Sequence, residues 1–147
     1  MRNSEIEILL VEDNMGDADL TIRALRRENL ANKLVHLENG ADALDYIFAE
    51  GVYTDRNHHN LPQIILLDLN MPKVNGIEVL ERVKADERTK KIPVIVLTGD
   101  RDQRLKHQLL QEGADAFLLK PIHYEDLLAV IRSFVEIRSL DVEGELQ

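Results

Sequence analysis

The sequence predicts an α/β domain built on a doubly wound, five-stranded parallel sheet with helices on both faces. Short aliphatic runs alternate along the chain with longer segments of helical periodicity, which is the pattern of successive β-α-β units. The runs at 64–67 and 93–97 are almost wholly aliphatic, as strands buried on both faces are. A length of 147 residues fits one domain, and no repeat or linker divides it.

The expected elements follow one another in a regular order. We predict strands at 6–11, 33–37, 64–67, 93–97 and 116–119. We predict helices at 17–28, 41–50, 77–86, 101–111 and 124–137. The first of these helices places Leu20, Ala24 and Leu25 on one face, and the fourth has Leu105, Leu109 and Leu110 as its apolar residues.

Composition narrows the class of function. The formal net charge is −9, and an acidic surface repels nucleic-acid phosphates, so we expect protein partners and bound cations but no nucleic acid. The absence of cysteine excludes a disulfide framework and a thiolate zinc site. The first residues lack the form of a signal peptide, and no apolar run approaches the roughly 20 residues that span a bilayer. We therefore expect a cytoplasmic protein without a membrane partner.

Polar residues follow the predicted strands. Glu12 and Asp13 come after the first strand, Asp68 after the third, Thr98 after the fourth and Lys120 after the fifth. Ligands of open parallel sheets bind beyond the carboxyl ends of the strands, so these side chains are expected to converge there. Clustered carboxylates without His or Cys favour Mg²⁺. A carboxylate such as Asp68 at this rim can act as a nucleophile and form an acyl phosphate.

Four motifs in order at these strand ends resemble the response-regulator receiver family. They are Val11-Glu12-Asp13-Asn14, then Leu66-Leu67-Asp68-Leu69-Asn70-Met71-Pro72 with Gly76 beyond it, then Val96-Leu97-Thr98-Gly99, then Leu119-Lys120-Pro121. The resemblance covers residues 5–135 and implies the flavodoxin-like (βα)5 receiver fold. Within the family the chain is most similar to single-domain receivers of the chemotaxis and phytochrome-associated types, the latter because of its long 51–60 loop.

The resemblance implies a role in a two-component phosphorelay. A histidine kinase or phosphotransfer protein would donate a phosphoryl group to Asp68. Mg²⁺ would be held by Glu12, Asp13, Asp68 and the backbone carbonyl of Asn70. The chain would then catalyse only its own phosphorylation and dephosphorylation, and so would not be an enzyme in the usual sense.

The same resemblance assigns the residues that would sense the phosphoryl group. Thr98 and Lys120 would bind its oxygens. Phe117 lies three residues before Lys120, where the family carries an aromatic switch that moves inward with Thr98. The alternative is that Phe117 is simply part of the core, as a single Phe in a strand usually is.

The last predicted helix is the best candidate for an interaction surface. Its apolar residues cover about half of its circumference, wider than the roughly 100° stripe that packs one helix on a core. These residues are Leu127, Leu128, Val130, Ile131, Phe134, Val135 and Ile137. The apolar surface beyond that stripe would form a homodimer contact through this helix and neighbouring elements. Alternatively, the helix is buried more deeply in the domain than a surface helix is. We expect a receiver domain over residues 5–137 and, at 138–147, a short loose tail without an output domain.

Two other functions fit part of the pattern. An aspartate-based phosphatase would also place an Asp nucleophile at a strand end, but it needs a second Asp two residues on as general acid. Here that residue is Asn70, whose amide cannot deliver the proton. A constitutive scaffold would not need the complete set of site residues. His58 and His59, in the long loop, are expected to be solvated and to bind no metal.

Overall fold

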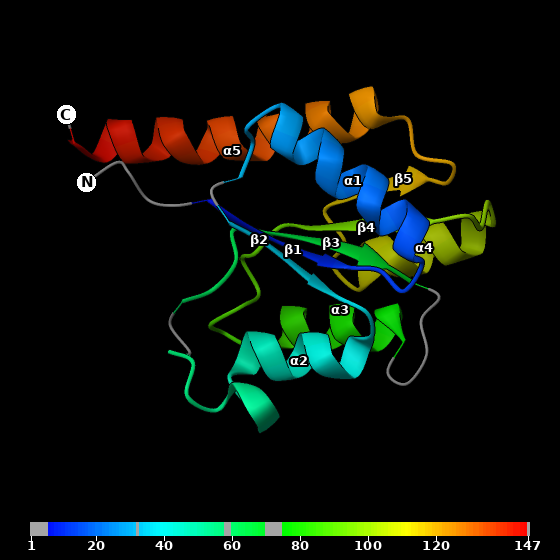
Figure 1. The fold of residues 1–147 in the computed structure, drawn as a ribbon, viewed down its shortest axis with the longest axis horizontal. Helices are drawn as coiled ribbons and strands as arrows, with labels where there is room; N and C mark the ends of the chain where they lie inside the picture. Colours follow the sequence, from blue (N-terminus) through cyan, green and yellow to red (C-terminus); the bar gives the residue numbers. More distant parts are fainter. Residues whose placement is uncertain (1–5, 32, 58–59, 70–74, 147) are drawn as a thin grey trace.

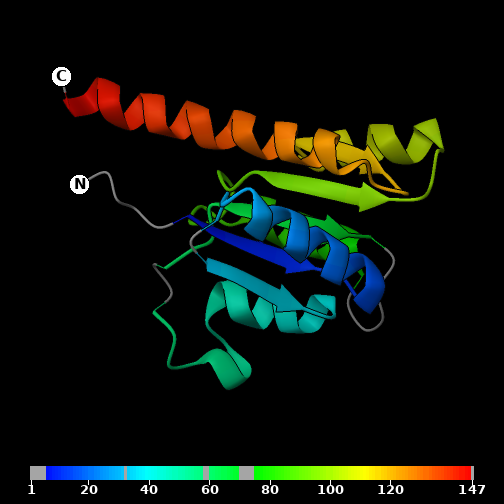
Figure 2. The ribbon, with the colours of Figure 1, turned by 45° about the horizontal axis from the view of Figure 1, so that its top comes forward.

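The computed structural model describes residues 6–31, 33–57, 60–69 and 75–146, with side chains as far as Val135. Five parallel strands form one sheet, as predicted, and their order in it is β2-β1-β3-β4-β5 (Figures 1 and 2). The strands are β1 Glu7–Val11, β2 Lys33–Leu37, β3 Ile64–Asp68, β4 Val94–Thr98 and β5 Ala116–Leu119. The helices are α1 Met15–Arg27, α2 Gly40–Phe48, the short 3-10 helix η1 Gly51–Tyr53, α3 Gly76–Ala85, α4 Gln103–Gln111 and α5 Tyr124–Leu146.

Helices cover both faces of the sheet and divide the core into two layers. α2, α3 and α4 pack on one face, and α1 and α5 pack on the other (Figure 1). Successive residues of a strand point to opposite faces, so Leu9 and Val11 of β1 join the first layer while Ile8 and Leu10 join the second. All four side chains are fully buried or nearly so, which explains why this central strand is a continuous aliphatic run.

Side-chain caps fix where four of the helices begin. In each case an Asn or Asp oxygen accepts a hydrogen bond from a backbone N–H of the first turn, which satisfies a donor that the helix itself leaves unpaired. The capping pairs are Asn14 with Asp17, Asn39 with Asp42, Asn75 with Glu78, and Asp102 with Arg104. Three of these caps lie just beyond the carboxyl end of β1, β2 or β4, so they also shape the rim where ligands are expected.

The structure corrects several predictions. Leu20 and Leu110 were counted with the apolar residues of their helices, but they are exposed, at 50% and 51%. The buried face of α1 consists instead of Ala18, Thr21, Ala24 and Leu25. α5 continues to Leu146, whereas we expected it to end at residue 137 and to be followed by a loose tail. In the part of the chain that the structure describes, no helix is long and apolar enough to cross a membrane.

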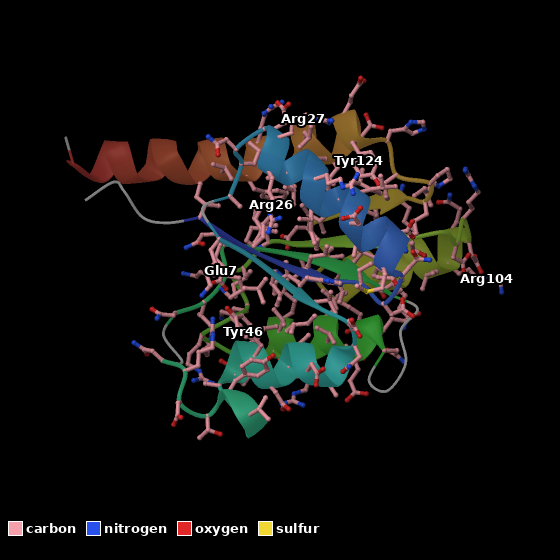
Figure 3. The ribbon with its side chains drawn as sticks, in the orientation of Figure 1. Glu7, Arg26, Arg27, Tyr46, Arg104 and Tyr124 are labelled. Atoms are coloured by element: carbon pink, nitrogen blue, oxygen red, sulfur yellow. The ribbon has the colours of Figure 1, made fainter. Side chains whose placement is uncertain are left out.

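The connection between α2 and β3 is anchored at the amino ends of the strands. The Arg56 guanidinium lies 3.8 Å from the centre of the Tyr46 ring and donates to the Tyr46 carbonyl over 3.0 Å. The hydroxyl of Tyr46 donates to the carboxylate of Glu7, the first residue of β1 (Figure 3). Glu7 also lies 3.6 Å from Arg56 and 3.5 Å from Lys33. This anchor sits at the opposite end of the strands from the polar residues predicted to form the site.

Gly76 makes close backbone contact with the end of β3. A Cβ atom there would lie 2.5 Å from the carbonyl oxygen of Asp68 and 2.7 Å from the Cα of Leu69. Neither atom can move without moving the backbone that carries Asp68, so only glycine fits. Gly99, after β4, is different, because a Cβ atom there would meet nothing within 4 Å.

Candidate functional site

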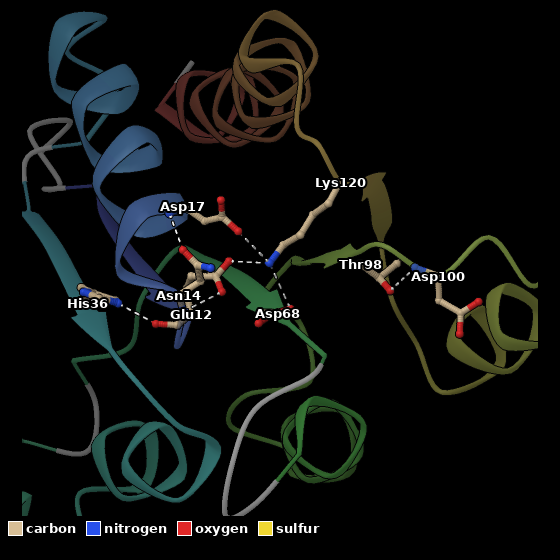
Figure 4. A network of polar contacts seen from close by, with 8 residues as sticks. All are labelled: Glu12, Asn14, Asp17, His36, Asp68, Thr98, Asp100 and Lys120. Carbon is tan, nitrogen blue, oxygen red and sulfur yellow. Dashed lines mark hydrogen bonds and ion pairs between the residues drawn. The ribbon is translucent and has the colours of Figure 1, made fainter.

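The structure brings Asp68, Glu12 and Lys120 together at the carboxyl edge of the sheet (Figure 4). Asp68 is the last residue of β3, and Glu12 directly follows the neighbouring β1. The Lys120 Nζ lies 2.9 Å from Glu12 Oε1 and 3.4 Å from Asp68 Oδ1. Both carboxylates are almost fully buried, so a single ammonium provides much of the positive charge that they require.

Asp13 adds an exposed carboxylate to this group. Ligand oxygens of Glu12, Asp13 and Asp68 all lie within 4.8 Å of one another. The donor set contains only carboxylate oxygens, which fits the hard cation Mg²⁺ better than zinc or copper. Asn70, the fourth predicted ligand, lies outside the described residues, as do His58 and His59.

The surroundings of Asp68 oppose its negative charge. Burial raises the pKa of Asp68 to about 7, and hydrogen bonding and charge from Glu12 act in the same direction. Lys120 opposes the rise, whereas contact with Asp13 adds to it. A carboxyl group whose pKa is raised in this way lies in a site that is short of positive charge. A bound divalent cation would supply that charge.

Lys120 is held in its charged form by its neighbours. Burial alone would lower the pKa of Lys120, but the carboxylates of Glu12, Asp68 and Asp17 outweigh burial and raise it. The Lys120 ammonium is thus a fixed positive charge at the mouth of the site. Asp17, 3.4 Å away from it, is a site residue that the sequence analysis did not single out. The sequence did contain a signal for this role, because Asp17 lies in the first turn of the helix that follows Glu12 and Asp13.

Glu12 is fixed by backbone contacts as well as by Lys120. Its side chain accepts a hydrogen bond from the N–H of Asn14 over 3.2 Å. Its carbonyl oxygen lies 2.8 Å from His36 Nε2 of β2. This contact of His36, which stabilises the turn between β1 and α1, was not expected from the sequence.

Thr98 ends β4 beside Asp68, with its side chain buried. Its hydroxyl oxygen accepts a hydrogen bond from the N–H of Asp100 over 3.1 Å. The hydroxyl hydrogen therefore remains available to donate to another oxygen. A phosphoryl group on Asp68 would present such an oxygen.

Phe117 of β5 pairs with Val96 of β4, two residues before Thr98, and is half-buried. The Lys106 ammonium of α4 lies 5.3 Å from the centre of the Phe117 ring, within the range of a cation–π contact. Both residues line a cavity of 550 Å³ between α4 and β5, and the cavity also reaches Thr98. The ring thus has space beside it, which a residue fully packed in the core would not have.

The apolar face of α5 is buried only in part. Leu127, Leu128 and Ile131 are buried, whereas Val130, Phe134 and Val135 are half-buried. The side chain of Ile137 lies outside the description. Val130, Phe134 and Val135 thus pack against the core and keep part of their apolar surface exposed. Leu119, at the end of β5, is 42% exposed.

Comparison with known proteins agrees with this geometry. Residues 8–132 match the family model of the response regulator receiver domain. The probable methanogenesis regulatory protein FilR2 of Methanothrix harundinacea is 38% identical over 130 residues, which cover 88% of this chain and 81% of FilR2.

Two solved structures are similar in fold and sequence. The Mn(2+)-bound form of response regulator Rcp1 has a TM-score of 0.75 and 31% identity, over 87% of this chain and 90% of that one. The phosphorylated cyanobacterial phytochrome response regulator RcpA has a TM-score of 0.77 and 31% identity, over 90% of this chain and 93% of that one.

Proposed function

The chain belongs to the response regulator receiver family, and on that premise we propose that it is a switch operated by phosphorylation of Asp68. The observation that carries the proposal is the position of Asp68. Its carboxylate ends a buried strand, 3.4 Å from the Lys120 ammonium and within the carboxylate cluster that fits Mg²⁺. This arrangement would supply the nucleophile, the cation and the metal ligands that phosphoryl transfer to a carboxylate requires.

The donor would be a histidine kinase or phosphotransfer protein that carries a phosphohistidine. An oxygen of the Asp68 carboxylate forms the new bond to phosphorus, the bond from phosphorus to the imidazole nitrogen breaks, and its electron pair stays on that nitrogen. Lys120 supplies a point charge to one oxygen of the transferred group. Thr98 donates its hydroxyl hydrogen to another oxygen once the group is in place.

Mg²⁺ is the proposed cofactor. Glu12, Asp13 and Asp68 would hold it together with the backbone carbonyl of Asn70, as the resemblance to receivers implies. The cation would neutralise the charge that the phosphoryl group brings to an already acidic site. The Mn(2+)-bound form of the related Rcp1 supports a divalent cation in this family.

The output would be a change in protein–protein contacts. Movement of Thr98 toward the phosphoryl group would draw Phe117 into the neighbouring cavity and change the surface formed by α4, β5 and α5. The partly exposed apolar residues of α5 support a homodimer through that helix and its neighbours, and likeness to the phytochrome response regulator RcpA supports a phytochrome-linked sensor. The chain would act in the cytoplasm, with its receiver domain over residues 5–137 and without binding nucleic acid.

Phosphoryl uptake tests the proposal. Wild type and Asp68→Asn are incubated with acetyl phosphate and Mg²⁺, and the intact mass of each is measured. We expect one phosphoryl group on wild type, none on the variant and none on wild type in EDTA. Equal uptake by both proteins would contradict the proposal. Sizing chromatography of the two forms then tests whether phosphorylation drives pairing.

A further inference from the structure

Lys120 is shared by three carboxylates, and one of them does not belong to the proposed metal and phosphoryl site. The Nζ atom lies 2.9 Å from Glu12, 3.4 Å from Asp68 and 3.4 Å from Asp17. The side chain of Asp17 is 47% exposed, whereas those of Glu12 and Asp68 are 2% and 5% exposed. Asp17 therefore draws the ammonium toward solvent and α1, and Asp68 draws it toward β3 (Figure 4).

The position of Asp17 is fixed by the start of α1. Its N–H donates to the Asn14 side chain over 2.9 Å, and the N–H of Asn14 donates to Glu12 over 3.2 Å. The turn that holds Glu12 thus also holds Asp17 beside Lys120. The Asp17 carboxylate is not the cap of the helix, because Asn14 performs that function. A change of its charge should therefore leave the helix intact.

From this geometry we propose that Asp17 is a positioning residue that restrains Lys120 in the unphosphorylated protein and thereby weakens its hold on a phosphoryl group. The inference rests on the proposed function, because it concerns the same site. An ammonium has three donor hydrogens, but it can approach only some of its partners closely at one time. A phosphoryl group on Asp68 must compete with Asp17 for this ammonium, so Asp17 sets how readily the phosphorylated state forms.

The size of the effect follows from the exposure of Asp17. Ion pairs with a partner this exposed contribute little, and loss of one changes a binding constant by about two- to fivefold. Asp17→Asn keeps the size of the side chain and removes its charge. Lys120 then keeps only Glu12 and Asp68 as partners. The variant should therefore bind a phosphoryl analogue about two- to fivefold more tightly than wild type.

Asp19→Asn is the matched control for loss of charge. Asp19 lies on the same helix, but its carboxylate pairs with Arg23 over 3.0 Å and not with Lys120. Asp17→Glu is the rescue variant, since it restores a carboxylate that can reach the ammonium. A purely electrostatic effect of net charge would appear in both Asn variants, whereas an effect through Lys120 would appear only in Asp17→Asn.

The experiment titrates beryllofluoride, a phosphoryl analogue, at saturating Mg²⁺ and detects the bound form by ¹⁹F NMR. In parallel, the ¹⁵N signal of the Lys120 ammonium is followed in lysine-labelled protein without the analogue and is assigned by its loss in Lys120→Arg. We expect Asp17→Asn to bind more tightly and to shift the Lys120 signal, and Asp19→Asn and Asp17→Glu to resemble wild type.

The inference can be overturned for the variant alone or together with the proposed function. If Asp17→Asn binds beryllofluoride no more tightly than Asp19→Asn does, or leaves the Lys120 signal unchanged, Asp17 does not position Lys120. If wild type itself binds no beryllofluoride, the proposed function fails first, and the inference fails with it.

Discussion

Asp68→Asn should stabilise the protein when no metal is present, although it removes the proposed phosphoryl acceptor. Asp68 is buried beside Glu12, and its pKa is raised to about 7 from the ordinary value of 3.8. The folded protein therefore binds the Asp68 proton more tightly than the unfolded chain does. Stability is lost as the pH rises from about 4 to about 7, because folding must then keep a costly negative charge buried.

The rise in the pKa of Asp68 sets an upper limit to this loss of stability. A difference of about three units, at 1.36 kcal/mol per unit, corresponds to roughly 4 kcal/mol above pH 8. At pH 5 the same relation gives less than half of that amount, because the unfolded carboxyl is ionised and the folded one is not. Asparagine carries no charge at any pH, so Asp68→Asn should be more stable than wild type by about 1–4 kcal/mol at pH 8 and by clearly less at pH 5.

Urea denaturation in EDTA measures the difference. The chain has no tryptophan, so far-UV circular dichroism of the helices is the appropriate signal. Added Mg²⁺ should reduce the advantage of the variant, because the cation stabilises wild type by compensating the charge of Asp68. The reasoning would be refuted if the variant were less stable than wild type in EDTA at pH 8, or if the difference did not change between pH 5 and pH 8.

Three further predictions concern the framework of the site. Gly76→Ala should destabilise the protein by about 1–3 kcal/mol and slow phosphoryl uptake on Asp68, whereas Gly99→Ala should do neither. Urea denaturation measures the stability of each variant, and intact mass measures its phosphoryl uptake. Arg56→Ala should lower the free energy of unfolding in urea by about 1–2 kcal/mol but leave phosphoryl uptake unchanged, since this residue anchors the opposite end of the sheet. Impaired uptake would show that this anchor and the site are not independent. Lys120→Met should destabilise the metal-free protein by about 1–3 kcal/mol because two buried carboxylates lose their cation, and a thermal melt should show Mg²⁺ recovering part of the loss.

Much of the fold could be predicted from the sequence because its strands are unambiguous. A run such as Ile64–Asp68 is buried on both faces, so nearly every residue in it is aliphatic. Helix faces were harder to predict. Leu20 lies on the apolar face suggested by periodicity, yet the buried stripe of α1 consists of three small side chains and Leu25, and Leu20 is half exposed. Which stripe faces the sheet depends on how closely the helix packs, and that is a tertiary property.

The candidate site was predictable as far as it depends on strand ends. Glu12, Asp68 and Lys120 were expected at one edge of the sheet because parallel strands end there, and the structure brings them within ion-pair distance. Asp17 was missed because its approach to Lys120 depends on the rotation of α1 about its axis. The contact of Lys106 with Phe117 likewise depends on the placement of α4 against β5. The metal and phosphoryl roles of these residues remain predictions.

The most direct test of the central claim locates the phosphoryl group itself. Borohydride reduces an acyl phosphate to an alcohol and thereby marks the residue that carried it. Cleavage by trypsin should release residues 57–73, a peptide in which Asp68 is the single acidic residue, so its mass alone identifies the site. We expect the reduced residue in this peptide after treatment with acetyl phosphate and Mg²⁺, and not after treatment in EDTA. A mark on the peptide that carries Glu12, Asp13 and Asp17, with residues 57–73 unmodified, would contradict the claim.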